Sequence, residues 1–160
     1  MVTTVPVPAN ANDPDPDDPD VEGTRMSAVL ARAEAAVADL AKDYAGWARA
    51  DVVKARAALA SATDDAAHRA EHVEALFRVA HDLKGQGASF GFPLVTRLGH
   101  SLCLLTRDRA LDYRAKHLDL VKSHLDAIEL VLTKEIKGEG GKVGAELVAK
   151  LERLVAEALG

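Results

Sequence analysis

His81 and the residues that follow it form the stretch of this sequence best suited to chemistry. Lys84 follows His81 by three residues and Gly85 by four, so on an α-helix all three share one face. Gly85 places no side chain beside the imidazole, and Lys84 places an ammonium group near whatever the imidazole meets. An open imidazole beside a cation suits a nucleophile that takes up a doubly charged anion. A phosphoryl group is the simplest candidate for that anion.

The glycines after His81 depart from helical preference. Leu76, Ala80 and Leu83 recur at helical spacing, which predicts a helix whose apolar face is buried. Gly85 and Gly87 lie where that helix should continue, and each costs about 0.5–1 kcal/mol relative to alanine in a helix interior. Such departures tend to fall at functional sites. The alternative is a solvated histidine followed by a loop.

The stretch around His81 resembles the signature of histidine phosphotransfer (HPt) domains. It reads His-Asp-Leu-Lys-Gly at 81–85 and Ala-Ser-Phe-Gly at 88–91. The family pattern is H-x-L-K-G, followed by small residues that end in glycine. The resemblance covers roughly 43–137 and implies a four-helix bundle that relays phosphoryl groups between receiver aspartates. It departs from the family at 106–108, where Thr-Arg-Asp stands in place of a frequent glutamate.

The resemblance implies roles for the residues around this motif. His81 is expected to be the phosphorylated nucleophile, Lys84 to stabilise phosphoryl charge, and Gly85 to give the receiver access. Gln86 and Ser89 are expected to add hydrogen bonds. The residues expected to contact the receiver are Phe77, Arg78, Ala88, Arg97 and His100. For the last two, ordinary solvated side chains are the alternative.

The composition favours helices packed on helices. Hydrophobic residues make up 48% of the chain and aromatic residues only 4%, with alanine and leucine dominant. A net charge of −5 and the absence of a basic stripe argue against nucleic-acid binding. No apolar run is long enough to span a membrane, and the N-terminus lacks the pattern of a secretory signal. The cytoplasm is therefore the expected location.

The first 23 residues differ from the rest of the chain. They hold five of the six prolines and a cluster of aspartates, which predicts a disordered tail. Residues 24–160 are predicted to form one all-α domain, an antiparallel four-helix bundle with an additional helix at each end. The expected bundle core is 43–137, with helices at 43–61, 65–90, 93–106 and 112–137, and the expected flanking helices are 25–42 and 144–159. The alternative for 25–61 is one helix with a bend near Gly46. In the helix at 93–106, Ser101 is expected to lie off the buried stripe, which is formed by Leu94, Val95, Leu98, Leu102 and Leu105.

Several single residues carry predictions about burial. Tyr44 and Trp47 are expected to anchor the core, because large aromatic side chains bury the most apolar area. Cys103, the only cysteine, lies in an apolar run and is expected to be a buried small hydrophobe. His117 and His124 are interpreted as surface residues.

A second motif, His-x-x-Glu-His, spans His68, Glu71 and His72. Two histidines four apart on a helix are able to share a zinc ion, and the pattern occurs in inverzincin metallopeptidases. A metal-dependent hydrolase is therefore an alternative function. A solvated charged face is the favoured interpretation, because two-ligand matches arise easily by chance.

Taken together, the sequence predicts a stoichiometric phosphoryl carrier of a bacterial-type two-component phosphorelay. No nucleotide motif is present, so no autokinase activity is expected. The resemblance implies two partners, the receiver of a hybrid histidine kinase and the receiver of a response regulator. The chain is expected to need no cofactor of its own, with Mg²⁺ supplied by the receiver, and to be a monomer. The alternative is a helical interaction module that binds a receiver or kinase without phosphoryl transfer.

Overall fold

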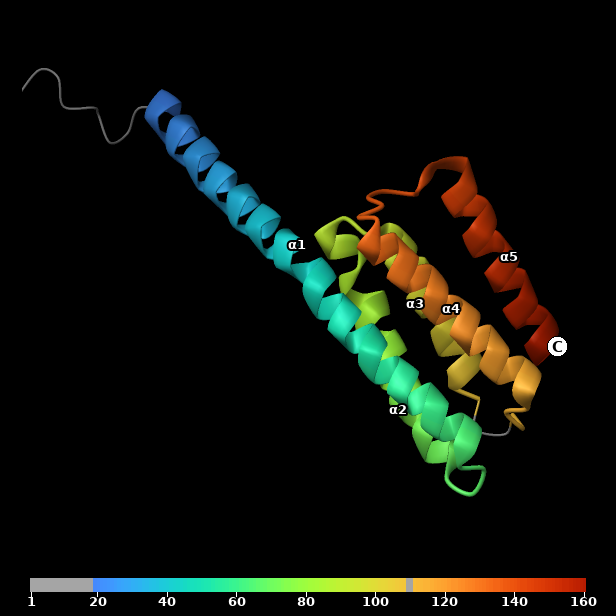
Figure 1. The fold of residues 1–160 in the computed structure, drawn as a ribbon. Helices are drawn as coiled ribbons and strands as arrows, with labels where there is room; N and C mark the ends of the chain where they lie inside the picture. The colour runs from blue at the N-terminus through green and yellow to red at the C-terminus, as the bar shows by residue number, and fades with distance from the viewer. Residues whose placement is uncertain (1–18, 109–110) are drawn as a thin grey trace, which may run out of the picture. The chain divides into compact units, whose positions relative to one another are not determined.

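The computed structural model describes residues 19–108 and 111–160, and these residues are all helical or in connections. No strand occurs in those two ranges, as the all-α prediction requires. The helices are α1 (Pro19–Asp64), α2 (Arg69–Gln86), the 3-10 helix η1 (Ala88–Phe90), α3 (Pro93–Thr106), α4 (Ala115–Thr133) and α5 (Gly141–Leu159) (Figure 1). Across the described ranges, none of these helices is both long and apolar enough to cross a membrane.

The chain divides into two compact units, Met1–Ala38 and Asp39–Gly160. In the first unit, the described residues form the beginning of α1 and bury no side chain. The second unit holds the end of α1 and all the other helices. The hydrophobic core lies entirely in this second unit, because the first buried residue of α1 is Tyr44.

In the second unit, the end of α1 forms an antiparallel four-helix bundle with α2, α3 and α4 (Figure 1). Helix α5 packs against α3 and α4. Apolar residues at helical spacing bury one face of each helix, which is the main source of helix stability in proteins. The predicted buried stripe of α3 is confirmed in full: Leu94, Val95, Leu98, Leu102 and Leu105.

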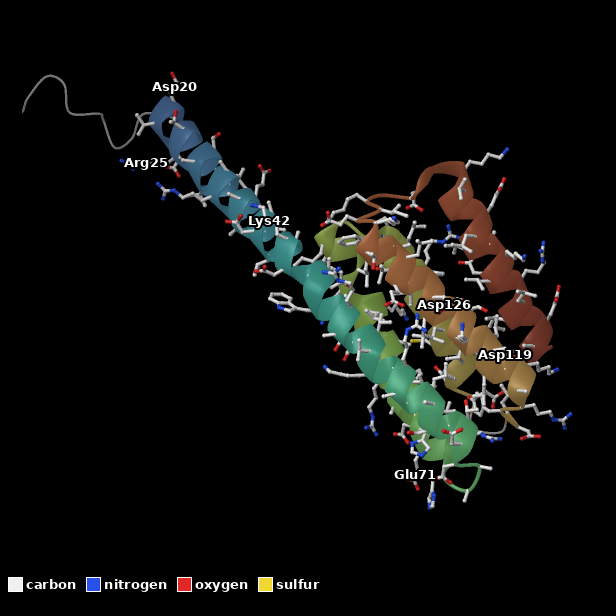
Figure 2. The ribbon with its side chains drawn as sticks, viewed as in Figure 1. Asp20, Arg25, Lys42, Glu71, Asp119 and Asp126 are labelled. Atoms are coloured by element: carbon white, nitrogen blue, oxygen red, sulfur yellow. The ribbon has the colours of Figure 1, made fainter. Side chains whose placement is uncertain are left out.

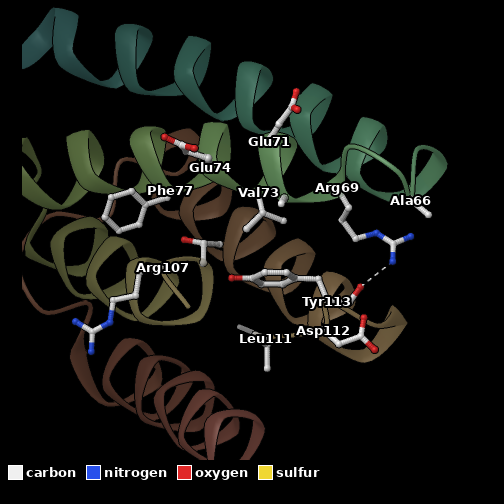
Figure 3. A pocket seen from close by; sticks show the side chains of 12 residues that line it. Ala66, Arg69, Glu71, Val73, Glu74, Phe77, Arg107, Leu111, Asp112 and Tyr113 are labelled. Atoms are coloured by element: carbon white, nitrogen blue, oxygen red, sulfur yellow. Dashed lines mark hydrogen bonds between the residues drawn. The ribbon is translucent and has the colours of Figure 1, made fainter. Parts of the chain in front are cut away.

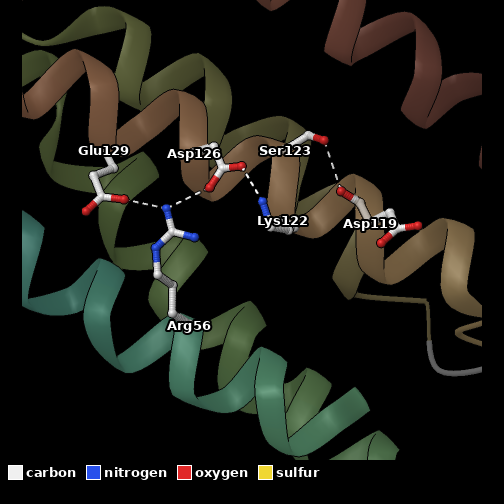
Figure 4. Close-up of polar contacts among 6 residues, drawn as sticks. All are labelled: Arg56, Asp119, Lys122, Ser123, Asp126 and Glu129. Atoms are coloured by element: carbon white, nitrogen blue, oxygen red, sulfur yellow. Dashed lines mark hydrogen bonds and ion pairs between the residues drawn. The ribbon is translucent and has the colours of Figure 1, made fainter.

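A charged cluster joins α1 to α4 on the outside of the bundle (Figure 4). One guanidinium nitrogen of Arg56 lies 2.8 Å from Asp126 Oδ1 and also contacts Glu129. Lys122 Nζ approaches the other oxygen of Asp126 at 2.8 Å. These groups are a third to more than half exposed, so solvent screening leaves the cluster a modest contribution to stability.

Helix α1 differs from the prediction at both its start and its middle. It begins at Pro19, so residues 19–23 are helical although the sequence indicated a tail; the rest of that tail lies outside the described residues. It also runs unbroken through 25–61, which agrees with the alternative of one helix and not with separate helices at 25–42 and 43–61. The surrounding alanines favour helix strongly enough that the isolated Gly23 and Gly46 do not end it. Pro19 suits a first helical position, and Asp20 and Glu22 favour a helix N-terminus.

The predicted helix at 65–90 is shorter in the structure. Helix α2 begins at Arg69, because Asp65 Oδ1 accepts the His68 N–H at 3.2 Å and closes a turn before it. It ends at Gln86, and the chain tightens into η1 before the left-handed Gly91, at φ +84°. The last two helices also differ from the prediction at their ends. Helix α4 is shorter than the predicted 112–137, and α5 starts three residues before the predicted 144.

The burial predictions for single residues had mixed outcomes. Tyr44 and Cys103 are buried, as predicted. Trp47 is 53% exposed, so its prediction as a core anchor was wrong; Ala48 occupies the inward position beside it. His117 and His124 were predicted on the surface and are buried, which is also a correction. His117 Nδ1 lies 2.9 Å from the backbone oxygen of Asp112 and 3.2 Å from the backbone nitrogen of Arg114, so it ties the first turn of α4 to the segment before it.

A buried hydrogen-bonded pair explains how the core accommodates His124. Its Nδ1 lies 2.8 Å from the backbone oxygen of Leu120, and its Nε2 lies 2.9 Å from Ser101 Oγ. Because a carbonyl only accepts, Nδ1 carries the proton and Nε2 accepts from the serine hydroxyl. Ser101 is buried too, although the apolar pattern placed it off the buried stripe of its helix. The pair ties α3 to α4 and requires a neutral imidazole.

This pair predicts acid sensitivity of the fold. Burial lowers the pKa of His124 from its ordinary 6.5, a shift partly opposed by the hydrogen bond to Leu120. The native state therefore binds fewer protons than the unfolded chain, and its stability falls as the pH drops below 6.5. We expect His124→Gln to weaken the dependence of the melting temperature on pH between neutrality and about pH 5. Thermal unfolding followed by circular dichroism gives the melting temperature of wild type and variant at each pH. The same pH dependence in both proteins would contradict the role given to His124.

Candidate functional site

His81 lies in the last two turns of α2 and points away from the core. Its neighbours Ala80 and Leu83 are buried and hold the helix against the bundle, whereas the His81 side chain is 67% exposed. The carboxylate of Asp82 lies beside it, with Oδ1 4.0 Å from His81 Nδ1. That separation is longer than a hydrogen bond. The backbone of His81 is therefore held in place by the packing of α2, and its imidazole is open to a partner.

The two positions one turn from His81 border the imidazole differently. Phe77, one turn before it, is half-buried, and its ring centroid lies 6.2 Å from that of the imidazole. Gly85, one turn after it, faces open space: a Cβ atom built there meets nothing within 4 Å. No packing inside the described chain requires a glycine at this position. Glycine at this position lowers the stability of the helix, and it leaves the approach to His81 open.

Gly87 has a different cause. A Cβ atom there would lie 2.9 Å from Phe92 O and from both the backbone nitrogen and Oγ1 of Thr96. The chain folds back tightly at this point, and Gly87 O accepts the Phe92 N–H at 2.8 Å. The sequence analysis treated Gly85 and Gly87 as one signal, but the structure separates them. Gly87 is needed for packing, and Gly85 is not.

Gly99 was missed by the sequence analysis, and it sets the contact between α2 and α3. A Cβ atom on Gly99 would lie 2.8 Å from Lys84 N and 3.0 Å from Ala80 O. The backbone of α3 therefore rests directly against the turn of α2 that carries His81. The available signal was a glycine in the middle of a strongly apolar helix, a costly choice that usually has a packing reason.

Lys84 is half-buried and lies on the side of α2 that faces α3. Burial raises the pKa of the Cys103 thiol, and the charges of Lys84 and then Arg107 oppose that rise. The close approach of Gly99 to the Lys84 backbone nitrogen places this residue directly against α3. Within 19–108 and 111–160, no carboxylate forms an ion pair with Lys84. Its charge is therefore not neutralised by a neighbour there.

The two residues predicted to add hydrogen bonds are both exposed, but the structure does not join them to His81. Gln86 follows His81 by five residues on a regular helix, which puts it about 140° around the axis. It thus lies off the face that His81, Lys84 and Gly85 share. Ser89 lies in η1, beyond the end of α2, and no hydrogen bond among the described residues joins it to His81.

The residues predicted to meet a receiver fall into two groups. Arg78 is exposed on the His81 side of α2 and pairs with Glu74 at 3.0 Å. Ala88 is exposed in η1, where its N–H donates to Thr96 Oγ1 at 2.7 Å. On α3, His100 is exposed, but the guanidinium of Arg97 lies 3.0 Å from Glu152 of α5.

That ion pair directs Arg97 towards α5, although the sequence analysis expected it at the partner surface. Of the five residues, Phe77 and Arg78 therefore lie on α2, Ala88 lies in η1, and Arg97 and His100 lie on α3.

The segment after α2 is held from two sides. The ring of Phe90 stacks on Tyr44 of α1, with centroids 4.7 Å apart. Lys137 Nζ lies 3.6 Å from the centroid of the Phe92 ring and donates to Phe90 O at 3.3 Å. Gly91 O accepts the Gly138 N–H. These contacts fix the end of α2 next to the imidazole.

The His-x-x-Glu-His motif does not assemble a ligand set. Asp65 Oδ2 lies 2.8 Å from His68 Nδ1 and 3.6 Å from His72 Nε2, whereas Glu71 lines a cavity elsewhere. Among the residues whose positions are described, no group of three or more His, Cys, Asp or Glu side chains is arranged to hold a metal ion. The hydrolase alternative thus has no geometric support in this part of the chain.

A cavity of about 520 Å³ lies between α2, the end of α3 and the connection to α4 (Figure 3). Val73, Phe77 and Tyr113 supply its apolar wall. Arg69 spans it by donating hydrogen bonds to Ala62 O and Tyr113 O, at 2.7 and 3.3 Å. His81 does not line this cavity, so the open imidazole and the cavity are separate features.

Comparison with known proteins gave one finding. The family model described as the Hpt domain matches residues 39–130, which is more than half of the chain. No curated protein and no solved structure matched the chain. The matched range contains α2, η1 and α3 in full, and with them His81 and the glycines discussed above. The chain therefore belongs to the Hpt domain family.

Proposed function

We propose that this protein is a histidine phosphotransfer protein of a two-component phosphorelay, with His81 as the residue that carries the phosphoryl group. Membership of the Hpt family indicates phosphotransfer in two-component signalling. The observation that carries the assignment to His81 is its exposed imidazole beside an open Gly85 and an unneutralised Lys84. The other five histidines lack this combination.

The chemical step follows from the position of the two ring nitrogens. Asp82 lies on the Nδ1 side of the imidazole, 4.0 Å away, so Nε2 is the ring nitrogen farther from this carboxylate. Nε2 then presents its lone pair to the phosphorus of a receiver aspartyl phosphate. The Nε2–P bond forms as the bond between phosphorus and the acyl oxygen breaks, and the electron pair leaves with the aspartate carboxylate. The reverse step returns the phosphoryl group to a second receiver.

Lys84 contributes charge to this step rather than a bond. In phosphoryl transfer, negative charge is spread over the equatorial oxygens, and a positioned cation stabilises it. Lys84 lies one turn from His81 on the same helix face and is not paired with a carboxylate in the described ranges. Its ammonium is therefore available to the transferring oxygens. Mg²⁺ would come from the acidic pocket of the receiver, which leaves this chain without a cofactor of its own.

Docking would place the receiver over α2 and η1. Phe77 offers an apolar surface, Arg78 a charge, and Ala88 a small exposed residue along this line. Gly85 leaves room for the receiver loops that surround the aspartate. The donor would be a receiver of a hybrid histidine kinase, and the acceptor a receiver of a response regulator. The carrier would act stoichiometrically in the cytoplasm.

The experiment that tests this function is transfer from receiver domains labelled as aspartyl phosphate. Wild-type protein is expected to take up an acid-labile, base-stable label, as a phosphohistidine does, and to pass it to an unlabelled receiver. His81→Ala is expected to take up none, while the control His68→Ala, which removes another exposed histidine, takes up the label. Circular dichroism confirms that each variant is folded.

Other outcomes of that experiment would contradict the proposal in different ways. Label on both wild type and His81→Ala would identify a different acceptor residue. No label on wild type, across receivers that themselves phosphorylate well, would favour the alternative of an interaction module. Such a module predicts that receiver binding survives the loss of His81.

A further inference from the structure

The beginning of α1 exposes a stripe of apolar side chains. Met26, Val29, Leu30 and Val37 are each 51% to 57% exposed. Ala33 lies between them on the same side of the helix. No residue of α1 before Tyr44 is buried. Most of the stability of a helix in a protein comes from packing its apolar face, so this exposed stripe is suited to a partner.

The spacing of this stripe is that of a coiled coil. Met26, Leu30, Ala33 and Val37 alternate steps of four and three residues, and Leu40 continues the same pattern along the sequence. Such a repeat keeps one seam facing a second helix with the same repeat. The charged residues of this segment lie outside the seam (Figure 2 labels Asp20, Arg25 and Lys42). We define the four residues Met26, Leu30, Ala33 and Val37 as the N-terminal stripe.

The sizes of the stripe residues suit an antiparallel pair of identical helices. In the register that sets Leu30 across from Ala33, Met26 of one copy meets Val37 of the other. Leu40 then falls opposite Gly23, where a Cβ atom would meet nothing within 4 Å. Each layer thus combines a larger side chain with a smaller one or with a glycine, which fills space evenly.

The charges at the two ends of the segment favour the same orientation, whereas Arg32 lies close to its own counterpart in either orientation. In this antiparallel register, Glu22 lies within one residue of Lys42 of the other copy, and Arg25 within one residue of Asp39. A parallel pair in register would instead set each charge beside itself. Like charges side by side destabilise a helix pair, and opposite charges support it.

We propose that residues 22–41 of two copies pair as antiparallel helices and make this protein a dimer. The proposal replaces the expectation of a monomer. It does not depend on phosphoryl transfer, because the N-terminal stripe precedes the family-matched range and His81 lies on α2.

Analytical ultracentrifugation over a range of protein concentrations tests the dimer. The full chain is expected to approach twice its 17.0 kDa mass. Leu30→Glu combined with Val37→Glu is expected to give the monomer mass at the same concentrations. The matched control, Ala28→Glu with Ala35→Glu, adds the same charges to the opposite face and is expected to remain a dimer. A wild-type monomer at every concentration, or a stripe variant that still dimerises, would overturn the proposal.

A spin-label distance tests the orientation. With Cys103→Ala removing the native thiol, a label at Glu22→Cys in an antiparallel pair lies about 28 Å along the axis from its counterpart, because residue 22 is opposite residue 41. In a parallel pair the two labels would be side by side. A short distance would therefore rule out the antiparallel register.

Discussion

Gly85→Leu is expected to lower the rate of phosphoryl transfer to His81 by at least about 100-fold, since misplacing reacting groups by about 1 Å has effects of that size. The leucine would stand one turn from the imidazole, on the face where the receiver approaches. It would meet no atom of its own chain, because the space at this position is open. The fold should therefore stay intact, and replacing a helical glycine should slightly stabilise it.

The measurement is the rate of label uptake from a phosphorylated receiver, together with the melting temperature of each variant. Gly85→Ala should stabilise the helix by about 0.5–1 kcal/mol and reduce the rate less than leucine does. Ala149→Leu adds the same side chain to an exposed position of α5 and should leave the rate unchanged. A wild-type rate for Gly85→Leu would mean that the receiver does not approach over this face.

Local patterns carried most of what could be predicted about the fold. The buried stripe of α3 followed directly from apolar residues at helical spacing, and the exposure of His81 followed from its place beside that kind of stripe on α2. Both depend on residues within a few turns of each other. The family motif adds chemical roles to these positions, but their geometry is the outcome of local spacing.

The histidines show where the local reading was incomplete. His117 and His124 fall on the same alternating spacing as Val121, Ile128 and Val131, so the pattern did contain a signal for burial. They were nevertheless interpreted as surface residues because histidine is polar. What the sequence does not display is the partner that makes burial tolerable: Ser101 is 23 residues away on another helix.

Long-range packing accounts for the remaining differences. Arg97 looked available to a receiver, but its ion pair with Glu152 depends on where α5 lies. Gly87 and Gly85 are indistinguishable by composition, and only the return of the chain at Phe92 and Thr96 separates their roles. The position of Gln86, by contrast, was open to prediction, because five residues along a helix place it about 140° around the axis from His81.

Gly99→Val is expected to destabilise the bundle by about 1–3 kcal/mol or more, the range for overpacking a tight core contact. The added side chain would be forced against the backbone of Lys84 and Ala80, where even a Cβ atom lies 2.8 Å from a backbone nitrogen. Backbone atoms of a helix have little freedom to move aside, so the two helices must separate. Because that turn of α2 carries His81, the phosphoryl transfer rate should fall as well.

Gly85→Val provides the matched control, because it makes the same substitution in a helix of the same bundle where the space is open. Chemical denaturation of both variants measures the difference in unfolding free energy, and subtracting one effect from the other removes the shared change in helix propensity. We expect the remainder to be large and unfavourable for Gly99. If the two valine variants were equally stable, α3 would not pack closely against α2 at Gly99. Another contact would then have to hold the turn of α2 that carries His81.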